Sequence, residues 1–95
     1  MSKSINDMTE ALAMARRIEG WLEKIRVTDV DRHQAAQDIL YRLDQEHGFR
    51  WRTGSEPQSL AFGGVSSSCS AGGIGLLRNW CAAVRRKAHE LEAAS

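Results

Sequence analysis

Hydrophobic positions recur at helical spacing along the first half of the chain, and this pattern predicts two helices. In the first, expected from Ser4 or Asn6 to about Arg26, every third or fourth position is apolar, so these side chains share one face. The second is expected from Val30 to His47. The first stripe comprises Ile5, Met8, Leu12, Ala15, Ile18, Leu22 and Ile25, and the second comprises Ala36, Ile39, Leu40 and Leu43.

A short joint separates the two predicted helices. Thr28 or Asp29 is expected to cap the second helix by accepting a hydrogen bond from a free backbone N–H. Gly48 stands where many helices end in a left-handed residue, a conformation that glycine adopts without steric cost. Two long helices joined by so short a connection predict an antiparallel helical hairpin over residues 1–48.

Beyond the second helix the pattern changes to strand periodicity. Aromatic side chains alternate with arginines over residues 49–53, and residues 59–65 are predicted to return alongside as a second strand. The segment between them has turn chemistry and contains the only proline of the chain. We therefore expect a two-stranded β-hairpin over residues 49–65. Its inward face is expected to carry Phe49, Trp51, Leu60 and Phe62.

Small residues then lead into a last helix, expected over residues 71–93. Its apolar stripe consists of Ile74, Leu77, Cys81, Val84, Ala88 and Leu91, flanked by Leu76 and Trp80. The order α-α-β-β-α predicts one α+β domain over residues 1–95, in which the helical hairpin and the C-terminal helix pack on the two-stranded hairpin. In this division, residues 66–95 form a Ser/Gly loop and the C-terminal helix.

The composition is that of an ordinary globular protein, with 42% hydrophobic and 26% charged residues in a chain of 95. No apolar run is long enough to span a bilayer or to form a secretory signal, which favours a cytoplasmic protein without a membrane partner. The net charge of +1 is unevenly spread. Residues 1–48 hold seven basic and nine acidic side chains, whereas residues 49–95 hold six and three, so the second half is the better candidate for an anionic partner.

Arginines of the second half form the first candidate site. Arg50 and Arg52 flank Trp51, which places both arginines on one face of a strand. Arginine is favoured at protein interfaces and also contacts phosphates, so a partner protein, nucleic acid and a merely solvated surface are three open interpretations. The residues predicted to bind a partner are Arg50, Arg52, Arg78, Arg85 and Arg86.

The small-residue segment before the last helix is the second candidate. Backbone N–H groups exposed in such a segment can hold a phosphate, and serine hydroxyls add further donors. The spacing matches neither a P-loop, which needs a lysine, nor the Rossmann motif, so a plain strand-to-helix connection stays open beside an anion or nucleotide site. The residues of this predicted anion site are Ser67, Ser68, Ser70, Gly72 and Gly73.

No residue pattern indicates catalysis, a cofactor or a metal. The histidines His33, His47 and His89 lack the HxxxH or HExxH spacing of zinc ligands. Cys69 and Cys81 form no CxxC pair and are expected to stay reduced, and nothing in the sequence brings a histidine to Cys69 as a base. We therefore interpret the chain as a binding protein and not an enzyme.

Self-association is left open, with a monomer and a homo-oligomer equally compatible with the sequence. Apolar side chains beside the main stripes exceed what a small core needs, and such side chains can build a dimer interface. The side chains concerned are Met14, Trp21, Leu76 and Trp80.

Four segments together resemble small accessory proteins of temperate, transposable bacteriophages: VSSSCSAGG at 65–73, LRNW at 77–80, VRRK at 84–87 and DRHQAAQD at 31–38. Such proteins bind and redirect host components, and include inhibitors of CRISPR effectors, sponges for cyclic nucleotides and antagonists of host regulators. The resemblance carries no catalytic motif and no site residues. It implies a phage-encoded inhibitor or modulator that docks on a host protein in the host cytoplasm. The alternative is a nucleic-acid or small cyclic-nucleotide binding protein that uses the Ser/Gly loop and the arginines.

Overall fold

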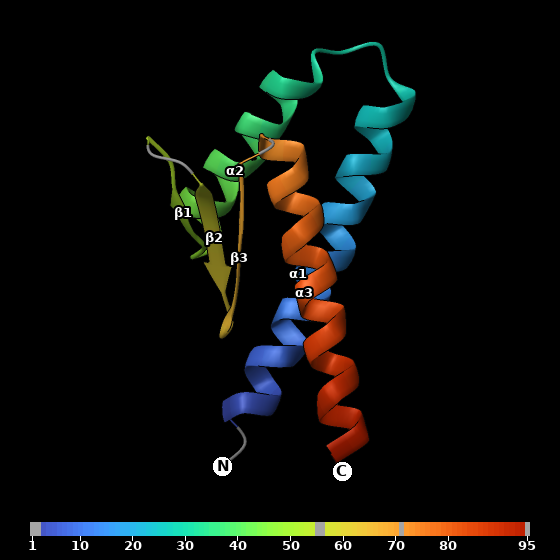
Figure 1. Cartoon of the computed structure of the whole chain (residues 1–95). Helices are drawn as coiled ribbons and strands as arrows, with labels where there is room; N and C mark the ends of the chain where they lie inside the picture. The colour runs from blue at the N-terminus through green and yellow to red at the C-terminus, as the bar shows by residue number, and fades with distance from the viewer. Residues whose placement is uncertain (1–2, 55–56, 71, 95) are drawn as a thin grey trace.

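The computed structural model describes residues 3–54, 57–70 and 72–94. Its elements are α1 (Lys3–Val27), α2 (Arg32–Glu46), β1 (Arg50–Arg52), β2 (Gln58–Phe62), β3 (Val65–Cys69) and α3 (Gly73–Ala94). The α+β class is confirmed, and the three helices lie to one side of a single sheet (Figure 1). That sheet has three strands in the order β1-β2-β3, where the sequence predicted two.

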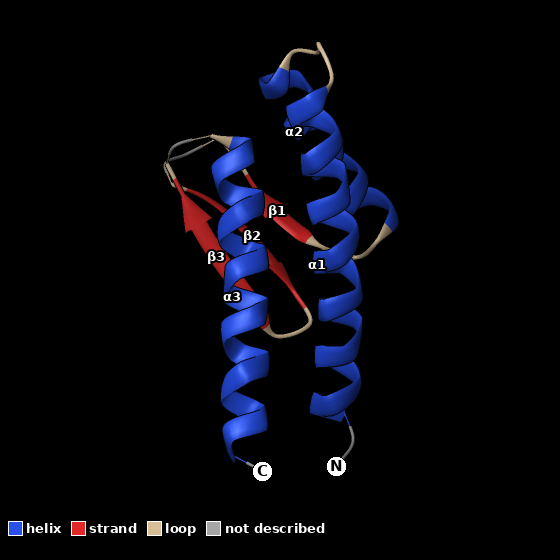
Figure 2. Ribbon diagram, turned by 90° about the vertical axis from the view of Figure 1, so that its right-hand side faces the viewer, coloured by secondary structure: helices blue, strands red, loops and turns tan. Residues whose placement is uncertain are grey.

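The two long helices, α1 and α3, lie side by side in opposite directions, so both chain ends are at the same end of the molecule (Figure 2). Small side chains allow this close approach. Ala11 and Ala15 of α1 are completely buried, and the Cys81 thiol of α3 lies 3.7 Å from the Ala15 carbonyl oxygen, to which it donates. Both predicted helices are confirmed within a few residues of their ends. No helix in the described part of the chain is long and apolar enough to cross a membrane.

The start of α2 is fixed by an aspartate that the sequence analysis did not select. The Asp31 carboxylate accepts hydrogen bonds from the backbone N–H groups of His33, at 3.0 Å, and Gln34, at 3.2 Å. Prediction of Thr28 or Asp29 as the N-cap was therefore wrong. Several capping residues stand close together here, and only the backbone geometry decides which one precedes the first turn.

The helical hairpin of α1 and α2 is open, because the first turn of α3 lies against α2 (Figure 1). Gly73 makes this contact: a Cβ built there would lie 3.0 Å from the Ala36 Cβ and 3.2 Å from the Leu40 Cδ1. Gly73 thus has a packing role. As predicted, Gly48 follows α2 with a positive φ of 77°.

Strand β3 is the element that the sequence analysis missed. Gly63 and Gly64 both have positive φ, 60° and 80°, which suits a tight two-residue turn that sends the chain straight back along β2. The segment predicted as a Ser/Gly loop from residue 66 is therefore a strand as far as Cys69, and the loop assignment was wrong. Its backbone pairs with β2 without needing the apolar alternation by which strands are recognised.

The inner face of the sheet completes the core, as predicted. Leu60 is fully buried and Phe49 is 2% exposed, while Trp51 and Phe62 are partly buried against the core. The rings of Phe49 and Phe62 stack with centroids 4.3 Å apart, and Trp80 of α3 packs 4.9 Å from Phe49. The Trp80 indole N–H donates to the Val65 carbonyl at 3.0 Å, so this side chain joins the helix to the sheet by both packing and a hydrogen bond.

Burial of Trp80 corrects one part of the self-association hypothesis. Leu76 and Trp80 are completely buried and Met14 is 8% exposed, so these three cannot form a dimer interface in the folded chain. Trp21 is partly buried, with the Arg17 guanidinium 5.5 Å from its ring centroid. The sequence placed Leu76 and Trp80 beside the stripe of α3 because it did not show that α3 is covered on two sides, by α1 and by the sheet.

Candidate functional site

The outer face of the sheet carries the two arginines that the alternation in β1 predicted. Arg50 lies opposite Ala61, which lies opposite Ser66, and Arg52 lies in the parallel row with Ser59 and Ser68. Residues directly opposite each other in a sheet share a face. This surface, which we call the outer sheet face, comprises Arg50, Arg52, Ser59, Ala61, Ser66 and Ser68.

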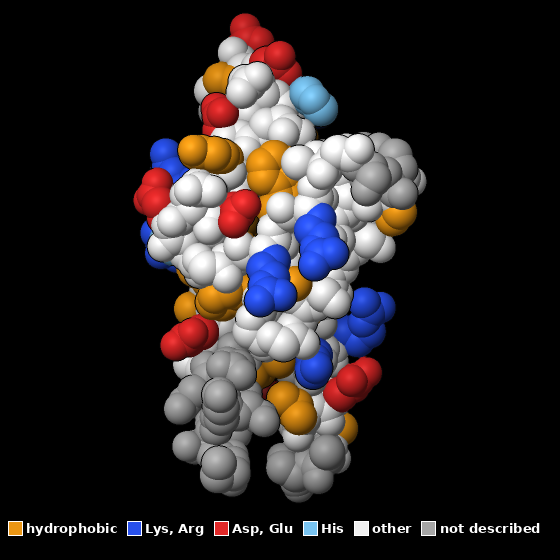
Figure 3. Space-filling view, turned by 90° about the vertical axis from the view of Figure 1, so that its left-hand side faces the viewer, with side chains coloured by type: hydrophobic (Ala, Val, Ile, Leu, Met, Phe, Trp, Pro, Cys, Tyr) orange, Lys and Arg blue, Asp and Glu red, His pale blue; other side chains and the backbone are white. Residues whose placement is uncertain are grey.

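None of the helices in the described part of the chain covers the outer sheet face (Figure 1). Figure 3 views the molecule from this side and shows basic side chains in the middle of the surface, with acidic ones around them. Arg50 and Arg52 are both exposed, and neither pairs with a carboxylate of the described residues. Their guanidinium groups are therefore available to a partner.

A second basic surface adjoins β3. Arg86 and Lys87 of α3, with the acidic Glu90 beside them, border a hollow of about 260 Å³ whose other side is formed by Gly64, Val65 and Ser66. The Lys87 ammonium donates to the Gly64 carbonyl at 3.3 Å. Because Ser66 also belongs to the outer sheet face, Arg86 and Lys87 extend that basic surface around the edge of β3.

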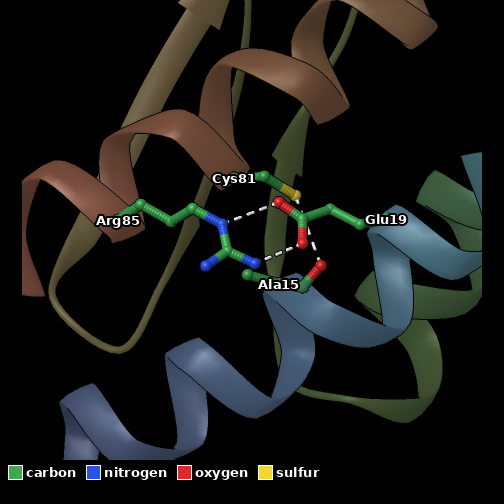
Figure 4. Close-up of polar contacts among 4 residues, drawn as sticks. All are labelled: Ala15, Glu19, Cys81 and Arg85. Atoms are coloured by element: carbon green, nitrogen blue, oxygen red, sulfur yellow. Dashed lines mark hydrogen bonds and ion pairs between the residues drawn. The ribbon is translucent and has the colours of Figure 1, made fainter.

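Arg85, which the sequence assigned to partner binding, has a partner within the chain. Its Nε donates to the Glu19 carboxylate at 2.9 Å and a terminal nitrogen donates to the other oxygen, which links α3 to α1 (Figure 4). The hydrogen bond from Arg85 lowers the pKa of the Glu19 carboxyl below its ordinary value, outweighing the opposite effect of burial. This two-bond geometry explains Arg85 as an interhelical contact.

Arg78 lies apart from the other predicted arginines. It borders a hollow of about 110 Å³ together with Arg26 of α1 and Arg32 of α2. The sequence analysis did not select Arg26 or Arg32. No spacing rule could have linked them to Arg78, because the three come from three different helices. The five predicted arginines thus divide among the outer sheet face, the β3 edge, the α1–α3 contact and this junction of helices.

The predicted anion site at the serines and glycines is not assembled as a loop. Ser67 points inward and its buried hydroxyl has no hydrogen-bond partner among the described residues, whereas Ser68 is on the outer sheet face. The Ser68 carbonyl accepts from the Asn79 amide at 3.2 Å. Ser70 is exposed beyond the strand, and Gly72 has a positive φ of 106°. Because alternate residues of a strand face opposite ways, these serines do not converge on one ligand.

Cys81 has the chemistry of a core residue and not of a nucleophile. It is 3% exposed, and burial, with the negative charge of Glu19 as a second cause, raises the pKa of the thiol from 9.0 to about 12. Cys69, on β3, is half-buried. The described residues contain no group of three or more His, Cys, Asp or Glu side chains that could hold a metal ion.

A labelling experiment checks the state of Cys81. The Cys69→Ser variant leaves Cys81 as the single thiol. At pH 8, the folded variant should react with a thiol reagent about a thousandfold or more slowly than the urea-unfolded variant. A thiol pKa of about 12 in place of 9.0 lowers the thiolate fraction by about that factor, and burial also excludes the reagent. The measurement is the rate of absorbance change with a disulfide reagent. Similar rates with and without urea would show that the thiol is accessible and that the α1–α3 packing is wrong.

Comparisons of the chain with protein families, with curated proteins and with solved structures find no match.

Proposed function

We propose that this protein is a non-enzymatic binding protein that docks on a second protein through its outer sheet face, with Arg50 and Arg52 as the central contacts. The observation that best supports docking is that these two exposed guanidinium groups share one uncovered face and lack a carboxylate partner among the described residues. Arg26 and Arg85, by contrast, are each held by a glutamate of the chain itself.

The partner is expected to present carboxylates. Arginine binds a carboxylate through two parallel hydrogen bonds, a geometry that lysine cannot reproduce. The serine hydroxyls of the same face, on Ser59, Ser66 and Ser68, can donate to or accept from a partner's polar groups. An acidic protein surface therefore fits this face in both charge and hydrogen-bonding capacity.

The sheet alone is too small for a stable interface. With strands about 4.8 Å apart and a rise of about 3.3 Å per residue, three strands of up to five residues present a face of about 10 Å by 16 Å. A standard interface buries about 800 Å² on each partner. The contact must therefore extend beyond the sheet, and Arg86 and Lys87 beside the β3 edge are the adjoining basic residues.

Binding of nucleic acid is the less supported alternative. Single strands bind where bases stack on exposed aromatic rings beside basic groups. Trp80 is completely buried and Trp51 faces inward, with its indole N–H donating to the Gln58 side chain at 3.1 Å. The outer sheet face thus has arginines for phosphates but no ring on which a base could stack.

The resemblance to small phage accessory proteins supports a more specific version of the proposal. The partner would then be a protein of the bacterial host, such as a defence protein or a regulator, and docking would inhibit or redirect it. In that setting the protein acts in the host cytoplasm.

Capture from a nuclease-treated bacterial lysate tests the proposal. At about 0.15 M salt, the tagged wild-type chain should retain a host protein in stoichiometric amount. The Arg50→Ala/Arg52→Ala variant should retain at least about ten-fold less of that protein. A ten-fold loss corresponds to about 1.4 kcal/mol of binding free energy, which is the minimum expected for central arginines. Arg16→Ala/Arg42→Ala removes the same charge from exposed positions on α1 and α2 and should capture as wild type does.

Two results would overturn the proposal. One is undiminished capture by Arg50→Ala/Arg52→Ala with unchanged circular dichroism, which would move the interface elsewhere. The other is recovery of nucleic acid or a nucleotide alone from an untreated lysate, with binding that falls steeply as salt is raised.

A further inference from the structure

The junction of the three helices contains a hollow of about 110 Å³ that is distinct from the outer sheet face. Its walls come from the end of α1, the start of α2 and the first turns of α3. Its apolar lining residues are Leu22, Ile25 and Ile74, and its other lining residues are Arg26, Arg32 and Arg78. We call it the three-arginine hollow.

Charge around this hollow is unbalanced. None of its lining residues is acidic. Arg26 is paired with Glu23, with nitrogen–oxygen distances of 2.7 and 3.2 Å, and the hydrogen bond from Arg26 lowers the pKa of the Glu23 carboxyl. Arg32 and Arg78 pair with no carboxylate of the described residues. The lining arginines, taken together with Glu23 as the one carboxylate that pairs with them, carry a net charge of +2.

The arginines have no evident role in holding the helices together. Like charges that meet at one hollow repel each other, and neither Arg32 nor Arg78 makes a hydrogen bond within the described residues that would offset this repulsion. The start of α2 is already capped by Asp31, so an anion in the hollow would be held by the arginine side chains and not by the helix N-terminus. A bound dianion would neutralise the charge of Arg32 and Arg78 and accept hydrogen bonds from both.

We propose that the three-arginine hollow binds the phosphate group of a small phosphorylated molecule, held by Arg32 and Arg78, with Arg26, which is engaged by Glu23, beside them. A doubly charged phosphate matches the net charge, and its oxygens accept the paired N–H groups of guanidinium. The hollow has a volume of about 110 Å³, and we place the phosphate group in it, against the arginines. Any organic part of the ligand would lie at the mouth.

Titration calorimetry on the full chain at low salt tests this proposal with two probes, inorganic phosphate and AMP. At least one should bind saturably with one site per chain, and binding should weaken as salt is raised. Equal affinities would assign the hollow to phosphate itself, and tighter binding of AMP would assign it to a phosphate monoester whose organic part contacts the mouth. In wild-type protein, bound probe should also shift the Nε–H NMR signals of Arg32 and Arg78.

The double variant Arg32→Gln/Arg78→Gln should bind the probe about ten-fold or more weakly than wild type. The control variant Arg16→Gln/Arg42→Gln has the same change in charge and should bind the probe as wild type does. Both pairs are exposed, so circular dichroism should show unchanged folds. The proposal is overturned if neither probe binds saturably up to about 10 mM, which corresponds to negligible affinity, or if Arg32→Gln/Arg78→Gln binds normally. Neither result bears on protein docking, which depends on Arg50 and Arg52.

Discussion

Replacing Trp80 with alanine is expected to lower the free energy of unfolding by about 3–5 kcal/mol, the usual cost of removing a large buried aromatic. The side chain is completely buried, packs 4.9 Å from the ring of Phe49 and donates its indole N–H to the Val65 carbonyl. The change therefore removes a core contact and a buried hydrogen bond at once. Since small domains are stable by only about 5–15 kcal/mol, the variant should lose a large part of its stability.

Urea denaturation followed by far-UV circular dichroism measures this loss. Trp80→Phe is the matched variant, because it keeps an aromatic ring but removes the N–H donor. It should fall between wild type and Trp80→Ala, with the missing hydrogen bond costing about 1–3 kcal/mol. A Trp80→Ala midpoint near that of wild type would show that this tryptophan does not join α3 to the sheet.

Leu60→Ala should destabilise the protein by about 2–5 kcal/mol, because Leu60 is completely buried at the centre of the inner sheet face. Ala61→Ser is its control on the same strand. Ala61 belongs to the outer sheet face and is half-buried, so a hydroxyl there should change the stability by no more than about 0.5 kcal/mol. Thermal and urea denaturation of the two variants give the comparison.

The contrast between these neighbours also tests the outer sheet face. If Ala61→Ser were the costly change and Leu60→Ala the mild one, the sheet would face the opposite way. Arg50, which lies opposite Ala61, would then point into the core and could not be a docking residue. A stability measurement thus checks the geometry on which the proposed function depends, before any partner is known.

The sequence predicted the helices well because a helix that packs on one face has apolar residues at a regular spacing along the chain. Apolar spacing of three and four residues gives the positions of α1 and α3 within a few residues. The buried face of α3 was predicted only in part, because Leu91 of the predicted stripe is 44% exposed. Alternation in β1 likewise predicted that Arg50 and Arg52 face away from the core, and both are exposed. In each case the pattern that allows the prediction is contained within a few neighbouring residues.

The sequence of strand β3 has no such apolar periodicity. Three successive serines have no apolar alternation, and the strand is stabilised from outside itself: by its pairing with β2, by the Trp80 N–H on the Val65 carbonyl and by the Asn79 amide on the Ser68 carbonyl. Asn79 and Trp80 both come from α3. A pattern-based prediction could not find an element whose stability depends on contacts with a later helix.

By itself, the sequence determined the α+β class, the positions of the helices and the sidedness of β1, because these follow from hydrogen bonds and burial repeated over a few residues. Only the tertiary structure decided which charged groups meet. It paired Arg85 with Glu19, 66 residues earlier, and brought Arg26, Arg32 and Arg78 of three helices to one hollow. Exposed charges carry no periodic signal, so their partners emerge only when the apolar faces of the helices and the sheet have packed together.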